Sequence, residues 1–142
     1  MLLNMTIIQS SVDIKAPIDE VWAIVSDLDN EPKFWNGTKA IRNISKKGNL
    51  VNREITIAFR DQKCLQEITL YPKEKIQAVF TKGIIKGTKT INLNKKDSTT
   101  QLDVIWDIKL SGMMGMFTGM VKKHIKSGTE QALQSIKHEV ER

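Results

Sequence analysis

The sequence predicts an α+β domain in which a curved antiparallel sheet of about seven strands wraps around a long C-terminal helix, with one or two short helices after the first strand. Three observations lead to this prediction. The chain has 142 residues, 40% of them hydrophobic, which suits one domain over residues 1–142. From 38 to 110, apolar residues alternate between short polar turns, as in antiparallel strands. After Gly112 the period becomes helical.

The N-terminal segment predicts a strand followed by a short helix. Apolar and polar residues alternate over 6–15, the period of a half-buried strand. Pro17 suits the first position of a helix, because its missing N–H would have no partner there. Apolar residues then recur at helical spacing, so we expect an amphipathic helix over 17–28. Residues 33–35 are expected to form a second short helix or turn.

Six further strands are expected before the C-terminal helix. The clearest is the last, in which Leu102, Val104 and Trp106 share one face. Short turns rich in Lys, Asp, Asn and Gly join these strands, so consecutive strands should pair antiparallel. The predicted strands are 39–45, 51–59, 64–71, 76–82, 87–94 and 100–110.

One long helix is expected over 113–141, about 43 Å in length at 1.5 Å per residue. It would cover the apolar face of the sheet with an apolar stripe. The stripe consists of Phe117, Met120, Val121, Ile125, Ala132, Leu133, Ile136 and Val140. A single helix seldom fills the space above a curved sheet, so we expect a cavity between the two, which is the usual form of a ligand site.

Five short segments match motifs of one superfamily. They are VDIKAPIDEVW at 12–22, VSDL at 25–28, FW at 34–35, KGIIKG at 82–87 and TTQLDVIW at 99–106. Together they resemble the START-like (helix-grip, SRPBCC) superfamily, especially its polyketide cyclase/dehydrase and coenzyme Q-binding branches. The resemblance implies a helix-grip fold with a ligand cavity, and its motifs mark packing and turns rather than catalysis. One departure is Asn36-Gly37, where many members have a proline after the tryptophan.

The expected cavity wall combines aromatic, branched and flexible side chains. Methionine adapts to varied apolar ligands, and four of the six methionines lie within 113–120. They could admit a ligand, or simply fill gaps at the start of the helix. The apolar residues predicted to bind ligand are Trp35, Ile57, Phe59, Phe80, Trp106, Met113, Met116, Phe117 and Met120.

Two polar residues are candidates to orient the ligand. Arg53 has the same strand parity as Ile55 and Ile57, so it could point into the cavity and hold an anionic or carbonyl group. The alternative is an arginine at a strand end that reaches water. His124 lies one helical turn beyond Met120 and could bind a ligand oxygen or act as acid or base, or it could be an ordinary, partly exposed helix histidine.

The residue types predict no cofactor, no metal site and no catalytic constellation. His124 and His138 are the two histidines and would lie roughly 21 Å apart on one helix, so they cannot share a metal. Cys64 is the one cysteine and has no recognisable base partner. Whether the protein is an enzyme stays uncertain, with binding favoured.

The net charge of +6 is concentrated in one segment. Residues 73–96 contain seven lysines and one glutamate, a difference of six. This predicts either a solubilising surface or a contact with an anionic membrane surface, a ribosome or RNA. The lysines proposed for that contact are Lys82, Lys86, Lys89, Lys95 and Lys96.

The favoured function is binding of a hydrophobic small molecule: a lipid, an isoprenoid or quinone, or an aromatic polyketide-like compound. The alternatives are an enzyme of the polyketide cyclase/aromatase type and an interaction module that uses the basic segment. No apolar run reaches the roughly 18–20 residues of a membrane span, and the start of the chain does not resemble a secretory signal. We therefore expect a cytoplasmic protein; its oligomeric state is left open.

Overall fold

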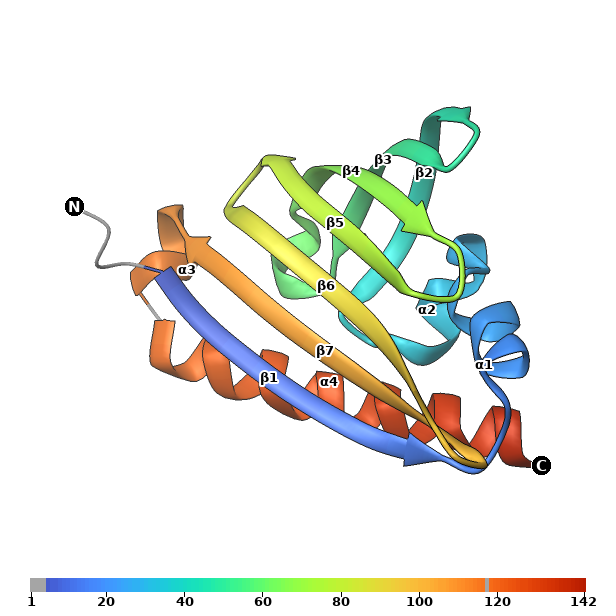
Figure 1. Cartoon of the computed structure of the whole chain (residues 1–142). Helices are drawn as coiled ribbons and strands as arrows, with labels where there is room; N and C mark the ends of the chain where they lie inside the picture. The colour runs from blue at the N-terminus through green and yellow to red at the C-terminus, as the bar shows by residue number, and fades with distance from the viewer. Residues whose placement is uncertain (1–4, 117) are drawn as a thin grey trace.

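Seven antiparallel strands form one continuous sheet in the computed structural model, which describes residues 5–116 and 118–142 except for the side chains of Met113 and Met114. The strand order is β1-β7-β6-β5-β4-β3-β2, so β1 and β2 are the sheet edges (Figure 1). Every strand after β2 pairs with the strand before it, as the short turns predicted. The strands are β1 (Met5–Ile14), β2 (Thr38–Lys47), β3 (Leu50–Ile57), β4 (Lys63–Tyr71), β5 (Lys75–Lys82), β6 (Ile85–Lys96) and β7 (Thr99–Leu110).

Three short helical segments follow β1. They are α1 (Ile18–Val25), the 3-10 turn η1 (Leu28–Asn30) and α2 (Glu31–Phe34). The helix predicted over 17–28 ends earlier because the backbone leaves the helical region at Asp27, whose ψ is 76°. Pro32 then lies in the first turn of α2, where a proline removes no helical hydrogen bond. Both helices lie near the C-terminal end of α4 (Figure 1).

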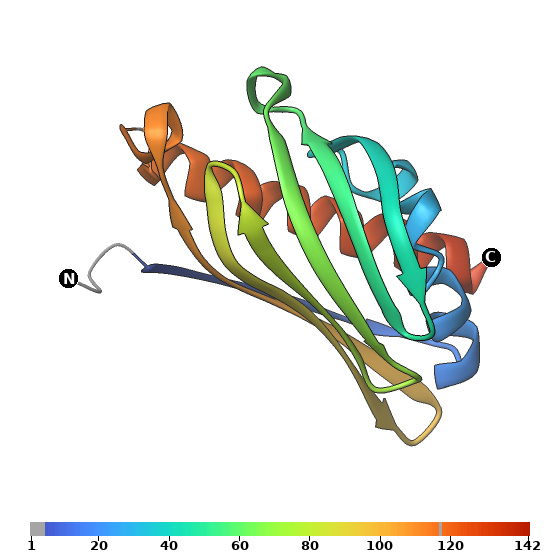
Figure 2. The same cartoon turned by 90° about the horizontal axis from the view of Figure 1, so that it is seen from above.

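Two helices, α3 (Gly112–Met116) and α4 (Thr118–Glu141), stand where one was expected over 113–141. Figure 2 shows α4 running along one face of the sheet. It also covers the β1 edge, where Lys126 and Lys137 donate hydrogen bonds to the carbonyls of Gln9 and Asp13. An edge strand with capped carbonyls is a poor template for pairing with another chain. The expected fold class, a sheet wrapped on a C-terminal helix, is confirmed.

Two backbone features shape the strands next to the site. The strand predicted over 51–59 ends at Ile57, because Arg60 and Asp61 adopt positive φ angles of 52° and 53° in the following 3-10 turn, η2 (Phe59–Asp61). Within β6, Gly87 has a φ of +114°, and an added Cβ would clash with the carbonyl oxygen of Asp107 and lie 2.9 Å from the Cα atom of Ile108. Only glycine fits this close approach of β6 to β7.

The core is divided into two apolar clusters along α4. Ala132, Leu133 and Ile136 pack the C-terminal half of α4 into the first cluster, together with residues of α1 and the sheet. Val121 belongs to the second cluster, under the N-terminal half, and Trp106 contacts both clusters. No helix in the described part of the chain is long and apolar enough to cross a membrane.

Candidate ligand cavity

A cavity of about 460 Å³ lies beneath the N-terminal half of α4. This volume falls within the range of small-molecule sites. Its wall is mainly apolar and comes from α2, the α2–β2 connection, the start of β2, η2, α4 and the inward faces of β3 to β7. The apolar lining residues are Trp35, Ile55, Ile57, Ala58, Phe59, Phe80, Ile85, Trp106, Val121 and Ile125. The polar and glycine lining residues are Glu31, Asn36, Gly37, Thr38, Gln66, Lys89, His124, Ser127, Gly128, Thr129 and Gln131.

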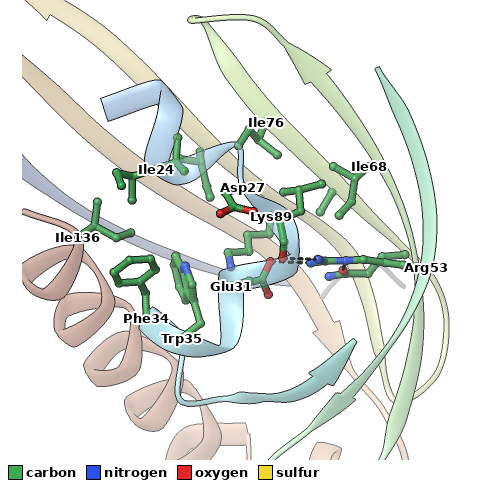
Figure 3. Close-up of a pocket in the computed structure, with 15 residues that line it drawn as sticks. Ile24, Asp27, Glu31, Phe34, Trp35, Arg53, Ile68, Ile76, Lys89 and Ile136 are labelled. Atoms are coloured by element: carbon green, nitrogen blue, oxygen red, sulfur yellow. Dashed lines mark hydrogen bonds and ion pairs between the residues drawn. The ribbon is translucent and has the colours of Figure 1, made fainter. Parts of the chain in front are cut away.

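A second, much smaller cavity adjoins the first. Its volume is about 30 Å³, enough for about one water molecule. Arg53 lines this small cavity, whereas Glu31, Trp35, Gln66 and Lys89 line both cavities. These four residues therefore form the partition between the two cavities. Figure 3 shows the lining of the small cavity, with Glu31 and Lys89 beside Arg53.

Arg53 is the centre of a buried polar cluster. Its side chain is 1% exposed. The guanidinium donates to Glu31 Oε1 at 2.6 Å through Nη2 and to Gln66 Oε1 at 2.8 Å through Nε, and its Nη1 lies 3.4 Å from the carbonyl of Leu28. The hydroxyl of Thr38 donates to the other Glu31 oxygen at 3.0 Å. A buried arginine is stable only when paired in this way.

Glu31 remains ionised in this setting. Burial by itself would raise the pKa of its carboxyl group. The positive charges of Lys89 and Arg53, with the hydrogen bonds from Arg53 and Thr38, outweigh that effect and bring the pKa below its ordinary value. The Glu31 charge is therefore matched by the adjacent guanidinium.

Lys89 is the second buried cation at the site. It is 6% exposed and lies on β6 opposite Trp106 of β7. Its Nζ is 3.2 Å from the ring centroid of Trp35 and 4.8 Å from that of Trp106. Burial lowers the pKa of Lys89 to about 8; the charge of Glu31 opposes this change and the charge of Arg53 adds to it. The ammonium group is thus largely protonated at neutral pH, between two indole faces.

The aromatic residues form a connected wall around Lys89. The rings of Trp35 and Trp106 meet edge to face with centroids 6.3 Å apart, and Phe80 stacks on Trp106 at 6.2 Å. Trp106 Nε1 donates to the hydroxyl of Thr129 at 3.0 Å, which in turn donates to the carbonyl of Ile125. This chain of contacts fixes the indole of Trp106 against α4.

A family model described as "Polyketide cyclase / dehydrase and lipid transport" matches residues 5–141. The chain belongs to this family. The START-like resemblance seen in the sequence is confirmed by this match. No curated protein matches the chain.

Solved structures of similar fold come from several bacteria. The Zhui aromatase/cyclase from Streptomyces sp. R1128 has a TM-score of 0.83 at 17% identity, over 97% of this chain and 94% of that one. A protein from Thermus thermophilus has a TM-score of 0.82 at 13% identity, over 95% and 97%. A START superfamily protein from Mycobacterium smegmatis has a TM-score of 0.66 at 16% identity, over 92% and 98%. At these identities the likeness concerns the fold.

The predicted aromatic and branched residues all line the large cavity of this polyketide cyclase/dehydrase family member. They are Trp35, Ile57, Phe59, Phe80 and Trp106. Phe59 lies in η2 and not on a strand face as expected, because the chain turns after Ile57. Its ring nevertheless reaches the cavity wall.

The methionines expected to admit a ligand do not line the cavity where the structure describes their side chains. Met116 and Met120 are 78% and 59% exposed and do not line the cavity. The cavity-facing row of α4 is Val121, Ile125 and Thr129, and Met120 lies about 100° around the helix axis from Val121. Phe117 lies outside the described residues, as does the side chain of Met113.

The two polar candidates occupy different positions. Arg53 points inward, as its strand parity predicted, but it faces the small cavity and is paired within the protein. Its interpretation as an arginine that reaches water is wrong. His124 is exposed on α4 and lines the rim of the large cavity.

Lys89 is one of the five lysines predicted to contact an anionic partner, and this part of the prediction is wrong. Lys89 is buried, so it is not available to an external partner. Lys82 and Lys86 are exposed near the β5–β6 turn, whereas Lys95 and Lys96 are exposed near the β6–β7 turn. Lys86 and Lys95 are nine residues apart on one strand, about 30 Å. The exposed lysines therefore form two separate groups.

Sequence analysis did not place Glu31, Gln66, Lys89 and Thr129 at the cavity, and it assigned Lys89 to the basic surface. A signal existed for two of them: Lys89 has the parity of the buried Ile91 and Leu93, and Gln66 has the parity of buried Cys64 and Ile68.

Burial raises the pKa of the Cys64 thiol, so Cys64 is a poor nucleophile. Among the described residues, no group of three or more His, Cys, Asp or Glu side chains could hold a metal ion.

Proposed function

We propose that this protein binds a hydrophobic small molecule, such as a lipid, an isoprenoid or an aromatic compound, in the cavity between the sheet and α4. The observation that supports this function is the cavity of about 460 Å³ with a mainly apolar wall. A ligand that fills it would gain about 25 cal/mol for each Å² of apolar surface removed from water, before the costs of association. Membership of a family described by lipid transport and polyketide cyclisation is consistent with this proposal.

The uncharged fluorescent dye 1-N-phenylnaphthylamine tests this proposal. We expect its emission to increase on mixing with the wild-type protein, because the dye would leave water for an apolar site. Ile125→Trp places a larger side chain on the cavity-facing row of α4 and should weaken dye binding by at least about tenfold. Lys123→Trp adds the same side chain at an exposed position of α4 and should leave binding unchanged.

Two results would contradict the proposal. One is the absence of dye binding by the wild-type protein. The other is equal dye binding by wild type and Ile125→Trp, with both proteins folded by circular dichroism. Native mass spectrometry of the purified protein adds an independent measurement, because a tightly bound apolar ligand would be retained as a discrete mass increase.

A second candidate function is proton-transfer catalysis of the polyketide cyclase type. The observation that favours it is that Lys89, with a pKa of about 8, lines the same cavity as the ionised Glu31. A group with a pKa near the working pH is suited to exchange protons with a substrate. An acyclic poly-β-ketone thioester should then cyclise and lose water faster with the wild-type protein than with Lys89→Met, as measured by mass spectrometry. Equal rates with and without protein would exclude cyclisation of this substrate.

A further inference from the structure

The ammonium group of Lys89 is buried against rings rather than against an acceptor. Nζ lies over the faces of Trp35 and Trp106. An ammonium has three hydrogen-bond donors, and a ring face offsets only part of the cost of removing it from water. Among the described residues, the hydrogen bonds to the Glu31 carboxylate come from Arg53 and Thr38 and not from Lys89.

The buried cluster has one positive charge in excess. Glu31 is the one acidic side chain among the described residues that line the large cavity. It forms its ion pair with Arg53 at 2.6 Å, and Gln66, the other side-chain partner of Arg53, is neutral. His124 lies on the rim of the cavity and is exposed. Asp27, which lines the small cavity, is exposed and accepts a hydrogen bond from Asn30. Among the described residues, Lys89 therefore shares the charge of Glu31 with Arg53 and has no carboxylate of its own.

We infer that Lys89 binds the acidic group of the ligand, and that the cavity takes an amphipathic monocarboxylate with an apolar body. This inference rests on the proposed function, because it assigns the polar end of the same ligand. The carboxylate would accept hydrogen bonds from Nζ. The apolar body would lie against Phe80, Ile57 and Val121, which line the same cavity.

The single excess positive charge of the buried cluster favours a monoanionic ligand group over a phosphate or a neutral alcohol. A carboxylate would neutralise the single excess charge and give Nζ a charge-assisted acceptor. A phosphate group, with its higher charge, would need a second cation. The nearest one, Arg53, faces the small cavity and already donates to Glu31. A neutral alcohol would leave the buried charge uncompensated.

The experiment compares 2-naphthoate with 2-naphthalenemethanol, which have nearly the same shape and differ in charge. Each competes with 1-N-phenylnaphthylamine for wild type, Lys89→Met and Lys86→Met at pH 7. Lys86 is the matched control, because it lies on the same strand but is exposed. Wild type and Lys86→Met should bind the acid about 10- to 100-fold more tightly than the alcohol. Lys89→Met should lose this preference and bind the acid no more tightly than the alcohol.

The outcomes separate the two proposals. Equal affinity of wild type for the acid and the alcohol would overturn the role of Lys89 and leave the binding function intact. A preference for the acid that persists in Lys89→Met would do the same. Failure of the wild type to bind the dye or either competitor would overturn the proposed function, and this inference with it. Lys89→Gln, which keeps a polar group at this position, provides a second variant if Lys89→Met does not fold.

Discussion

Replacing Lys89 by methionine should stabilise the ligand-free protein at pH 7. Burial lowers the pKa of Lys89 from 10.5 to about 8, a difference of about 2.5. At about 1.4 kcal/mol for each pKa unit, the charged form is disfavoured in the folded state by about 3 kcal/mol. Methionine has a similar length and no charge. It gives up about 2 kcal/mol of attraction to the indole rings, which the contacts of its own sulfur with the rings partly replace. We expect the free energy of unfolding to increase by about 1–3 kcal/mol.

The effect should depend on pH in a defined direction. Because the pKa of Lys89 is lower in the folded protein, the unfolded chain binds more protons between about pH 8 and 10.5. The stability of the wild type therefore gains from rising pH in this window, whereas below pH 8 the full penalty is present. Glu31 and Arg53, the charged groups beside Lys89, are retained in both proteins. The advantage of Lys89→Met should be largest at pH 7 and should shrink by pH 9.5.

Urea unfolding at pH 7 and at pH 9.5, followed by circular dichroism, measures this difference. Lys86→Met is the control, since Lys86 is exposed and its replacement should change stability by less than about 0.5 kcal/mol. The reasoning is refuted if Lys89→Met is less stable than the wild type by more than about 1 kcal/mol at pH 7. It is also refuted if the difference between the two proteins is the same at both pH values.

Two further substitutions test the polar cluster and the sheet. Glu31→Gln should lower the free energy of unfolding by about 3–5 kcal/mol in urea, because it leaves two buried cations without their anion. In a Lys89→Met background this loss should be smaller. An equal loss in both backgrounds would show that the charges of Glu31 and Lys89 do not interact. Gly87→Ala should lower the free energy of unfolding by more than about 1 kcal/mol, because a Cβ would clash with the Asp107 carbonyl oxygen at a φ of +114°. A thermal midpoint equal to that of the wild type would contradict this close contact.

The strands could be predicted closely because their signal is local. Alternation of apolar and polar residues identifies a half-buried strand within a few residues, and all seven predicted strands are present. The same alternation placed Arg53 on the inward face, where it lies. It would also have placed Lys89 inward with Ile91 and Leu93, but the excess of lysines in 73–96 suggested a surface instead.

The helical predictions were less complete for a different reason. The apolar stripe of α4 correctly included Val121, Ile125 and Leu133. Met120 belonged to the predicted stripe as well, yet it is exposed, because the sheet covers a narrower sector of the helix than the stripe occupies. Helical spacing shows which residues share a face, but the width of the covered sector depends on the partner surface.

The sequence by itself determined the order of the elements, the antiparallel sheet and the inward position of its apolar residues, because these follow from residue periods and from turns between neighbours in the chain. The tertiary structure alone decided which charges meet. Glu31, Arg53, Gln66 and Lys89 come from α2, β3, β4 and β6, and the folded sheet brings them together beside the cavity. Pairing of buried charges depends on distances of a few ångströms between such remote segments, and no local pattern contains that information.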